Sequence, residues 1–278
     1  MYSNIGNKTL VVLKMEIDFK FIKYECFEGT ALITINRPKV YNALNKDSKD
    51  EIQKALSLSE ENKDIGSIII TGEGKAFCTG QDLNDRSVSV KEGETIDLGH
   101  TLETEWNPLM KSIKSNSKVV IGAINGVCAG AGLPLAVSCD LIVAKPKIKF
   151  ISGFSKLGLI PDAGSSFTFT RALGYQKALE FFLLNKPLSS ETLLENKLIN
   201  FIDENPLELS KELAKNINAL SLASVKMIKQ NLQFSLEETY AKSIEKEVCC
   251  QRILGQSENY KEGLKAFFEK REAKFSRD

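Results

Sequence analysis

Histidine is nearly absent from this 278-residue sequence, with His100 as the single example. No motif pairs it with a serine or cysteine nucleophile, so a Ser-His-Asp or Cys-His triad is not indicated. No group of residues has the spacing of a metal site, and the sequence predicts no metal. Because Gly99 and Thr101 are typical of loops, we interpret His100 as a surface loop residue; contact with a substrate from a lid is the alternative.

The sequence also lacks a strong charge of one sign and a long apolar run. Its 37 basic and 36 acidic residues leave a net charge of +1, which predicts neither a nucleic-acid partner nor a membrane partner. No apolar run approaches the ~20 residues of a membrane span. The six cysteines stand in apolar or near-glycine contexts without metal spacing, which indicates reduced thiols in a cytoplasmic protein.

Strand-type runs alternate with helical segments through most of the chain, and this alternation predicts an α/β core. After about Asn205 the segments are all helical in period, with few strand formers. The first fourteen residues lack arginine and a long apolar run, so they are not typical of a targeting peptide. We expect a disordered extension over residues 1–14, a core over 15–205 and a helical region over 206–278. The polar stretch 84–99 predicts a mobile loop near the site.

Two glycine-containing segments carry most of the functional information. Residues 72–83 read GEGKAFCTGQDL and residues 125–135 read NGVCAGAGLPL. Each segment follows a short apolar run of strand type and leads toward a helix. Two strand-to-helix turns in one fold can direct two free backbone N–H groups at one oxygen atom, as in an oxyanion hole. Glycines alone more often indicate only tight turns.

The sequences of these segments resemble motifs of the crotonase superfamily, also called the enoyl-CoA hydratase/isomerase family. The resemblance covers residues 19–275. It implies an α/β fold with a crotonase-type ββα spiral core and an all-helical C-terminal trimerisation region. Residues 77–86 (FCTGQDLNDR) and 154–164 (FSKLGLIPDAG) are similar to one branch of the family, the isomerases of ring-1,2-epoxyphenylacetyl-CoA. The chain is therefore expected to form a homotrimer or a dimer of trimers.

The resemblance also implies which backbone groups form the oxyanion hole. The donors are the N–H groups of the residues that follow Gly80 and Gly130, namely Gln81 and Ala131. Ala131 would lie at the start of a helix over residues 132–139, where the helix dipole favours negative charge on an oxygen. Only backbone atoms donate, so the identity of these two side chains is free to vary.

The acid/base positions are where the sequence departs from hydratases of the family. Hydratases use two glutamates to handle water, and the matching positions here are Pro134 and Phe154. Asp162, in the segment IPDAG, matches a position at which other family members place an aspartate. One carboxylate is sufficient to remove a proton from one carbon and return it to another. Pro-Asp-x-Gly is also a typical turn sequence, in which the aspartate would only bond its own backbone.

Coenzyme A contacts follow from the same resemblance. Backbone atoms of Thr79, Gln81 and Leu83 would hold the adenine. The cations Arg37 and Lys39 would approach the phosphates. Phe267 and Lys270, in the tail, would reach a nucleotide, which in some members belongs to a neighbouring subunit. For the lysines, a solvated surface position is the alternative. An apolar acyl pocket would include Leu133, Pro134 and Phe154.

The resemblance thus implies an acyl-CoA isomerase that converts ring-1,2-epoxyphenylacetyl-CoA to oxepin-CoA through the oxyanion hole and Asp162. It needs no cofactor, because coenzyme A enters as part of the acyl-CoA substrate. The first alternative is a Δ3,Δ2-enoyl-CoA isomerase of fatty-acid oxidation. The second is a hydratase-like enzyme or a non-catalytic acyl-CoA-binding protein.

Overall fold

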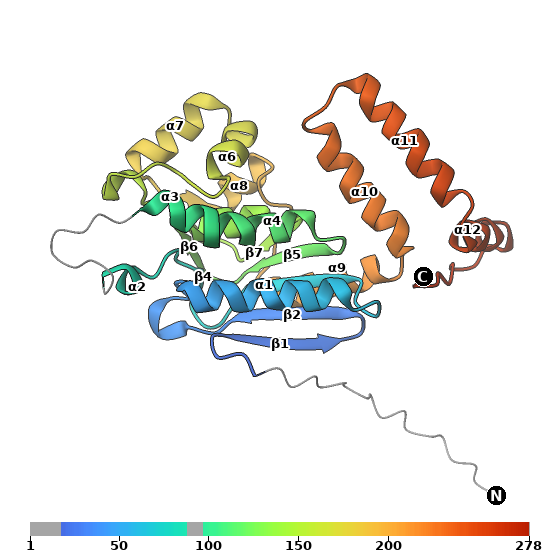
Figure 1. The fold of residues 1–278 in the computed structure, drawn as a ribbon, viewed down its shortest axis with the longest axis horizontal. Coiled ribbons are helices and arrows are strands. Elements are labelled where there is room, and N and C mark those ends of the chain that lie inside the picture. Colours follow the sequence, from blue (N-terminus) through green and yellow to red (C-terminus); the bar gives the residue numbers. More distant parts are fainter. Residues whose placement is uncertain (1–17, 88–96, 278) are drawn as a thin grey trace, which may run out of the picture.

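The computed structural model describes residues 18–87 and 97–277 (Figure 1). The extension expected over residues 1–14 and most of the loop expected over 84–99 lie outside the described residues. Two β-sheets form the centre of the described chain. The larger runs in the order β1 (Ile22–Phe27), β2 (Thr30–Ile35), β3 (Ser67–Gly72), β5 (Val119–Ile124), β7 (Leu141–Ala144) and β10 (Phe201–Ile202).

The chain alternates between this sheet and a smaller one. The smaller sheet runs in the order β4 (Ala76–Cys78), β6 (Val127–Ala129), β8 (Lys149–Ile151) and β9 (Leu188–Ser189). Each of β3, β5 and β7 is followed directly by a strand of the smaller sheet, namely β4, β6 and β8. The hairpin predicted at the start of the core is confirmed, since β1 and β2 pair antiparallel. From β2 to β10 the larger sheet is parallel.

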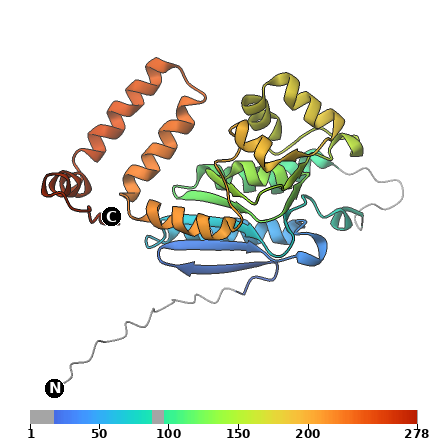
Figure 2. The same cartoon turned by 180° about the vertical axis from the view of Figure 1, so that it is seen from behind.

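Helices cover both faces of the larger sheet (Figures 1 and 2). One layer contains α1 (Lys46–Glu61), α4 (Asn107–Ser115) and α5 (Gly132–Ser138). Asn45 caps α1, because its side chain accepts a hydrogen bond from the Ser48 backbone N–H. The buried residues of α1 recur at helical spacing and include Ile52 and Leu56, so this face packs into the main hydrophobic core.

Further helices lie between the strands along the chain, and the last three of them contribute Phe169, Phe181 and Leu193 to the main hydrophobic core. They are α2 (Leu83–Ser87), α3 (Leu98–Thr101), α6 (Ser165–Leu173), α7 (Tyr175–Leu184) and α8 (Ser190–Glu195). A π-helical turn, Leu102–Trp106, joins α3 to α4, and short 3-10 turns lie at Pro38–Val40 and Ser155–Leu157. His100 was expected in a loop, but it lies in α3 and is exposed.

Helix α9 (Pro206–Asn218), the first helix of the region expected over 206–278, packs closely on the larger sheet. It packs on β2, β3, β5 and β7, on the sheet face opposite α1 (Figure 2). Its Ala214 joins a second apolar cluster with Ile69 and Ile121 of the sheet. The helices that project from the core therefore begin only with α10.

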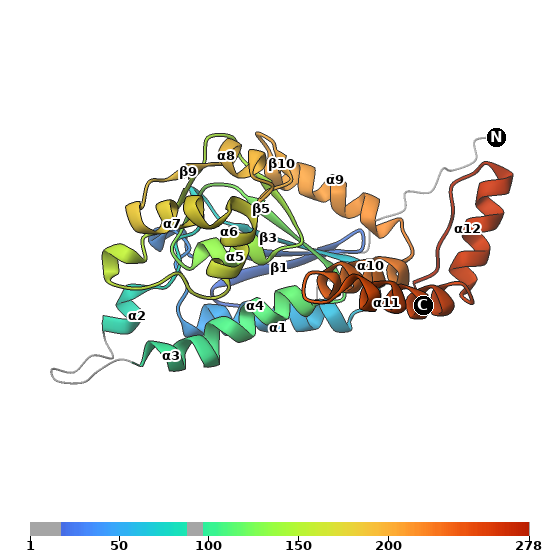
Figure 3. The same cartoon turned by 90° about the horizontal axis from the view of Figure 1, so that it is seen from above.

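The projecting region consists of α10 (Leu222–Ser235), α11 (Tyr240–Leu254) and α12 (Glu258–Glu269). Figure 3 shows α12 at the end of the molecule opposite α2 and α3. A buried ion pair holds α10 to the core, with Lys229 Nζ 2.6 Å from Asp140 Oδ2. Burial lowers the pKa of Lys229 and raises that of Asp140, and their mutual attraction opposes both shifts. No helix within residues 18–87 and 97–277 is both long and apolar enough to cross a membrane.

We predict that truncation after Asn205 gives aggregated or inactive protein. This change removes α9 and exposes side chains of the sheet that are now buried, among them Leu32 and Val143. Truncation after Leu220 is the matched control, because it keeps α9 in place and should leave the sheet face covered. Size-exclusion chromatography of both proteins makes the comparison. A soluble, active monomer from the shorter chain would contradict the role given to α9.

Candidate functional site

Strand pairing brings the two glycine segments together. β4 and β6 pair in parallel, with Cys78 opposite Cys128. The carboxyl ends of parallel strands lie at one edge of a sheet, so the residues that follow each strand become neighbours. Gly80 follows β4 and Gly130 follows β6, as the sequence predicted. Burial raises the pKa of the Cys78 thiol to about 12, so this thiol stays protonated beneath the site.

The two turns touch so closely that glycine is required at two positions. A Cβ at Gly80 would lie 2.6 Å from the backbone N of Ala131, and one at Gly132 would lie 2.2 Å from the carbonyl oxygen of Cys78. Gly80 also has φ +91°, a left-handed conformation that side-chain-bearing residues rarely adopt. The absence of these side chains therefore permits the contact between the turns.

Backbone hydrogen bonds orient the peptide that contains the Gln81 N–H. The carbonyl of Gly80 accepts a hydrogen bond from the Leu44 N–H at 2.7 Å, and the Asp82 N–H donates to the Leu44 carbonyl at 2.9 Å. The C=O and N–H of a trans peptide point in opposite directions. The Gln81 N–H therefore points away from Leu44, and it donates to no backbone group of the described residues.

Backbone hydrogen bonds also orient the Ala131 N–H, at the start of α5. The preceding carbonyl, that of Gly130, accepts a hydrogen bond from the Leu133 N–H at 3.0 Å, while the Gly130 N–H donates to Ile151 of β8 at 2.9 Å. Ala131 is the N-cap residue of α5. Its N–H donates to no backbone group within the described chain. Two backbone donors thus lie on adjacent turns, an arrangement suited to binding one oxygen that gains negative charge.

Asp162 lies in a tight turn that leads into α6. Its carbonyl accepts a hydrogen bond from the Ser165 N–H at 2.9 Å, and Ala163 and Gly164 both have left-handed φ angles, +50° and +91°. The segment does form the turn that its sequence indicates. The side chain is only half-buried, yet its Oδ1 atom is buried. A carboxylate held this way lies between the apolar interior and solvent.

The residues expected to form the acyl pocket are apolar and buried. Leu133 and Pro134 lie in the first turn of α5, and Phe154 precedes the 3-10 turn at Ser155–Leu157. Leu133 and Phe154 share the main core cluster with Ala131 and with Ala163, the neighbour of Asp162. None of the three can transfer a proton.

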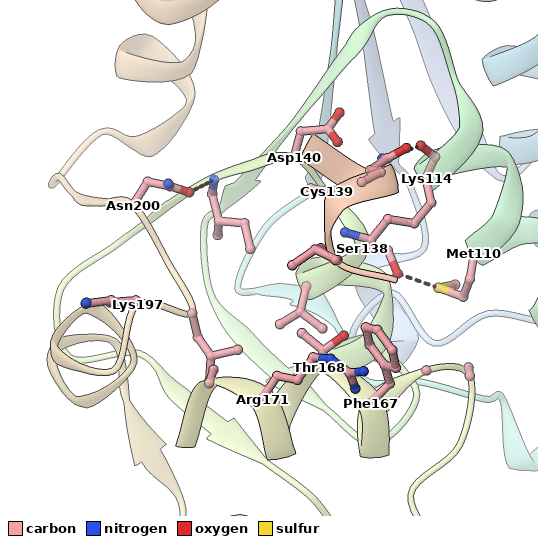
Figure 4. A pocket seen from close by; sticks show the side chains of 18 of the residues that line it. Met110, Lys114, Ser138, Cys139, Asp140, Phe167, Thr168, Arg171, Lys197 and Asn200 are labelled. Carbon is pink, nitrogen blue, oxygen red and sulfur yellow. Dashed lines mark hydrogen bonds between the residues drawn. The ribbon is translucent and has the colours of Figure 1, made fainter. Parts of the chain in front are cut away.

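A cavity of about 960 Å³ lies between α4, α5, α6 and α10. Figure 4 shows Lys114, Asp140 and Arg171 among the side chains around it. The cavity reaches Ala163 and Gly164, but neither Gln81 nor Ala131 lines it. This cavity is therefore distinct from the paired turns.

Arg37, which was expected near the phosphates of coenzyme A, makes contacts within the chain. Its guanidinium donates to the Ala43 carbonyl and lies 2.8 Å from Asp82 Oδ2, with both side chains largely buried. Burial alone would raise the pKa of Asp82, but the hydrogen bonds from Arg37 and Asn84 outweigh it and lower that pKa. Arg37 therefore stabilises the first glycine turn through Asp82, and its contact with a phosphate stays a prediction.

The other residues expected to contact coenzyme A are spread over the molecule. Thr79 donates a side-chain hydrogen bond to the Tyr41 carbonyl at 3.1 Å. Lys39, in the 3-10 turn Pro38–Val40, and Leu83, the first residue of α2, are both exposed. Phe267 belongs to α12 and Lys270 caps it. Within one chain, α12 lies far from β4 and β6 (Figures 1 and 3). The structure thus does not bring the tail residues to the paired turns.

Sequence reasoning missed the side chains that surround Gln81. Its Oε1 accepts hydrogen bonds from Lys49 Nζ and Trp106 Nε1, both at 2.9 Å. Lys49 also pairs with Glu105. One signal was available, because Lys49 falls at helical spacing with Ile52 on the buried face of α1. No set of histidine, cysteine, aspartate or glutamate residues in the described segments is arranged to hold a metal ion.

Comparisons with known proteins identify the family of the chain. Residues 25–278 match the family described as enoyl-CoA hydratase/isomerase. The 1,2-epoxyphenylacetyl-CoA isomerase of Escherichia coli K12 is 35% identical over 259 residues, covering 92% of this chain and 98% of that protein. The trans-2-decenoyl-(acyl-carrier-protein) isomerase of Streptococcus mutans is 32% identical over 263 residues, covering 94% and 99%.

Solved structures share the fold. The crystal structure of an enoyl-CoA hydratase from Polaromonas sp. JS666 has a TM-score of 0.85 to this chain at 28% identity, covering 92% of this chain and 99% of that one. The paired glycine turns, the spiral of strands through two sheets and these similarities over nearly the whole length lead to one conclusion. The chain belongs to the enoyl-CoA hydratase/isomerase family and has the crotonase fold.

Proposed function

We propose that this protein is an acyl-CoA isomerase that moves a proton within the acyl group of its substrate. The observation that carries the proposal is the pair of backbone N–H groups, Gln81 and Ala131, on turns that touch. A thioester oxygen bound there would be stabilised as it gains negative charge. Each such donor typically contributes about 3–4 kcal/mol to lowering a barrier.

Asp162 supplies the acid/base group in this proposal. Pro134 and Phe154 occupy the positions at which hydratases of the family carry glutamates, and both are buried. Neither can orient or activate a water molecule. Asp162 is the acidic residue that sequence resemblance places at the acyl group, and one of its oxygens is buried beside the core. This combination favours isomerisation over hydration.

The reaction then needs two proton transfers through one carboxylate. Asp162 removes a proton from the carbon next to the thioester, and the electron pair moves toward the thioester oxygen held by Gln81 and Ala131. Asp162 returns the proton to a carbon further along the acyl group as the electrons move back. For the ring epoxide, the carbon–carbon bond shared by the epoxide and the six-membered ring also breaks, and its electrons form the double bonds of the seven-membered oxepin. No atom is gained or lost, so no cofactor is needed beyond the coenzyme A of the substrate.

The proposed substrate is ring-1,2-epoxyphenylacetyl-CoA, and the product is oxepin-CoA. The name of the Escherichia coli relative supports this choice, as does an acyl site walled by Leu133, Pro134 and Phe154, which suits a flat ring. The second candidate is a Δ3,Δ2-enoyl-CoA isomerase. The name of the Streptococcus mutans relative, which refers to a linear decenoyl group, favours that alternative.

We also propose that the protein assembles as a homotrimer or a dimer of trimers in the cytoplasm. Apolar side chains on the projecting helices are strongly exposed in the single chain, including Leu232, Tyr240 and Phe268. Packing against another copy would cover them. In such an assembly Phe267 and Lys270 would approach the coenzyme A of a neighbouring subunit.

We predict that Gly80→Ala lowers turnover by at least ~100-fold, comparable to the loss of one oxyanion donor. The added Cβ would meet the Ala131 nitrogen and so separate the two turns. Gly158→Ala is the matched control, because Gly158 has φ +70° with no atom within 4 Å of the added Cβ. The control variant should lose only ~1–3 kcal/mol of folding stability, through backbone strain. Steady-state kinetics and thermal unfolding compare them; equal losses of turnover would argue against an oxyanion hole.

Asp162→Asn is expected to reduce turnover by ~100-fold or more while acyl-CoA binding persists. The amide keeps the size of the side chain but cannot accept the proton, and general acid/base groups contribute about that much. Asp64→Asn, at an exposed aspartate, serves as the control. Isothermal titration with phenylacetyl-CoA, beside the turnover assay, measures both quantities. Unchanged turnover in the Asp162 variant would remove Asp162 from the mechanism.

A panel of three thioesters separates the candidate reactions. The ring epoxide and a 3-enoyl-CoA should both be converted, with the ring epoxide preferred by ~10- to 200-fold in kcat/KM, because fit to an apolar pocket discriminates by only about 1–3 kcal/mol. Crotonyl-CoA should not be hydrated at a measurable rate. Competition between the first two substrates gives their ratio. Preference for the linear substrate would favour the second candidate, and rapid hydration would reject an isomerase.

A further inference from the structure

A charged cluster lies buried directly beside one of the two backbone donors. The Lys49 side chain on α1 is completely buried, and its Nζ pairs with the Glu105 carboxylate, which is 17% exposed. The same Nζ donates to Gln81 Oε1 at 2.9 Å. The Trp106 indole N–H donates to that oxygen too, also at 2.9 Å. We call Lys49, Glu105 and Trp106 the Gln81 clasp.

Stability alone gives little reason to place this cluster in the core. Removing a lysine and a carboxylate from water costs several kcal/mol per ion, and apolar replacements of such pairs are often neutral or stabilising. Lys49 lies 4.8 Å from the centroid of the Trp106 ring, which returns part of that cost through a cation–π contact. The cluster nevertheless directs two donors at one amide oxygen, and this geometry suggests a task at Gln81.

The task follows from the flexibility of the preceding residue. Gly80 has no side chain to restrict its backbone, so the peptide between Gly80 and Gln81 could rotate and turn the Gln81 N–H away. The Leu44 hydrogen bond holds one edge of this peptide. The clasp holds the other end, because a Gln81 side chain fixed at its tip restricts the backbone from which it extends.

The π-helical turn explains how two clasp residues reach the same place. Glu105 and Trp106 are the last residues of the turn Leu102–Trp106, directly before α4. Such turns are uncommon and are frequent at functional sites. Here Glu105 meets Lys49 and Trp106 meets Gln81, so both contacts of the turn converge on α1 and the first glycine segment.

We propose that Lys49, Glu105 and Trp106 are positioning residues that hold the Gln81 N–H in the direction needed to bind a thioester oxygen. The inference rests on the proposed function only for the placement of that oxygen. It does not depend on which isomerisation the enzyme carries out, or on Asp162. The clasp acts through Gln81 and does not itself touch the substrate.

The experiment measures the hydrogen bond to the thioester directly. Phenylacetyl-CoA carrying ¹³C at the thioester carbon is bound to the full-length protein, and the carbonyl stretch is recorded by infrared difference spectroscopy. Hydrogen-bond donation lowers this frequency. In Trp106→Phe and in the double variant Lys49→Met/Glu105→Gln, the band should move toward its position in water. The double variant removes both charges together, so no buried charge is left alone.

Kinetics provide a second readout. The clasp variants should lose turnover by about 10- to 100-fold, less than the ~100- to 1,000-fold loss of a whole donor, while the Kd for phenylacetyl-CoA changes by less than about threefold. The matched control is Lys229→Met/Asp140→Asn, another buried lysine–carboxylate pair, which joins α10 to the residue before β7 and lies outside the turns. It should leave the carbonyl band unchanged, even where it lowers the unfolding temperature.

The outcomes separate this inference from the proposed function. A band that shifts in the clasp variants but not in the control supports the clasp, even if no isomerase substrate is turned over. A band that stays in place in folded clasp variants overturns it, even if turnover requires Asp162. Trp106→Phe keeps most of the ring volume and removes one N–H. If the double variant does not fold, the carbonyl band of Trp106→Phe alone therefore tests the role of the clasp.

Discussion

The close contact between two glycine turns is the constraint on which the site depends. β4 and β6 pair in parallel, and the turns that follow them approach until Gly80 lies against the nitrogen of Ala131. The alternation of strands between two sheets makes this possible, because it repeats the same strand-to-helix turn at neighbouring places. The strands β4 and β6 belong to the smaller sheet, and the site that we propose depends on the two N–H groups of the turns that follow them.

Around this contact, polar side chains are used to fix backbone. Arg37 binds Asp82 on one side of the first glycine segment, and Lys49 with Trp106 binds Gln81 on the other. These groups are buried at a cost in desolvation, which a well-packed apolar core would avoid. In contrast, Leu133 and Phe154, which we propose for the acyl site, are apolar and buried in the main core. The proposed site thus combines a polar support for the backbone with apolar side chains, and we propose that Asp162 acts beside them.

The sequence predicted the parts of this arrangement that are local. The glycine turns, the strands before them and the turn at Asp162 each depend on a few neighbouring residues, and their patterns were sufficient. In the Gln81 clasp, Lys49 is 32 positions from Gln81 and 56 positions from Glu105. A single lysine on an apolar helix face does not indicate which distant residues it will contact. The contact between Arg37 and Asp82, 45 positions apart, was not predicted for the same reason. Helix α9 was assigned to the tail because its helical period does not reveal which sheet face it covers.

A crystal structure with bound phenylacetyl-CoA tests the central claim most directly. The account predicts that the thioester oxygen lies about 2.7–3.1 Å from the backbone nitrogens of both Gln81 and Ala131, the range for effective oxyanion donors. It also predicts that the Asp162 carboxylate faces the carbon next to the thioester. A thioester bound elsewhere, such as in the cavity beside Lys114 and Arg171, would contradict the account.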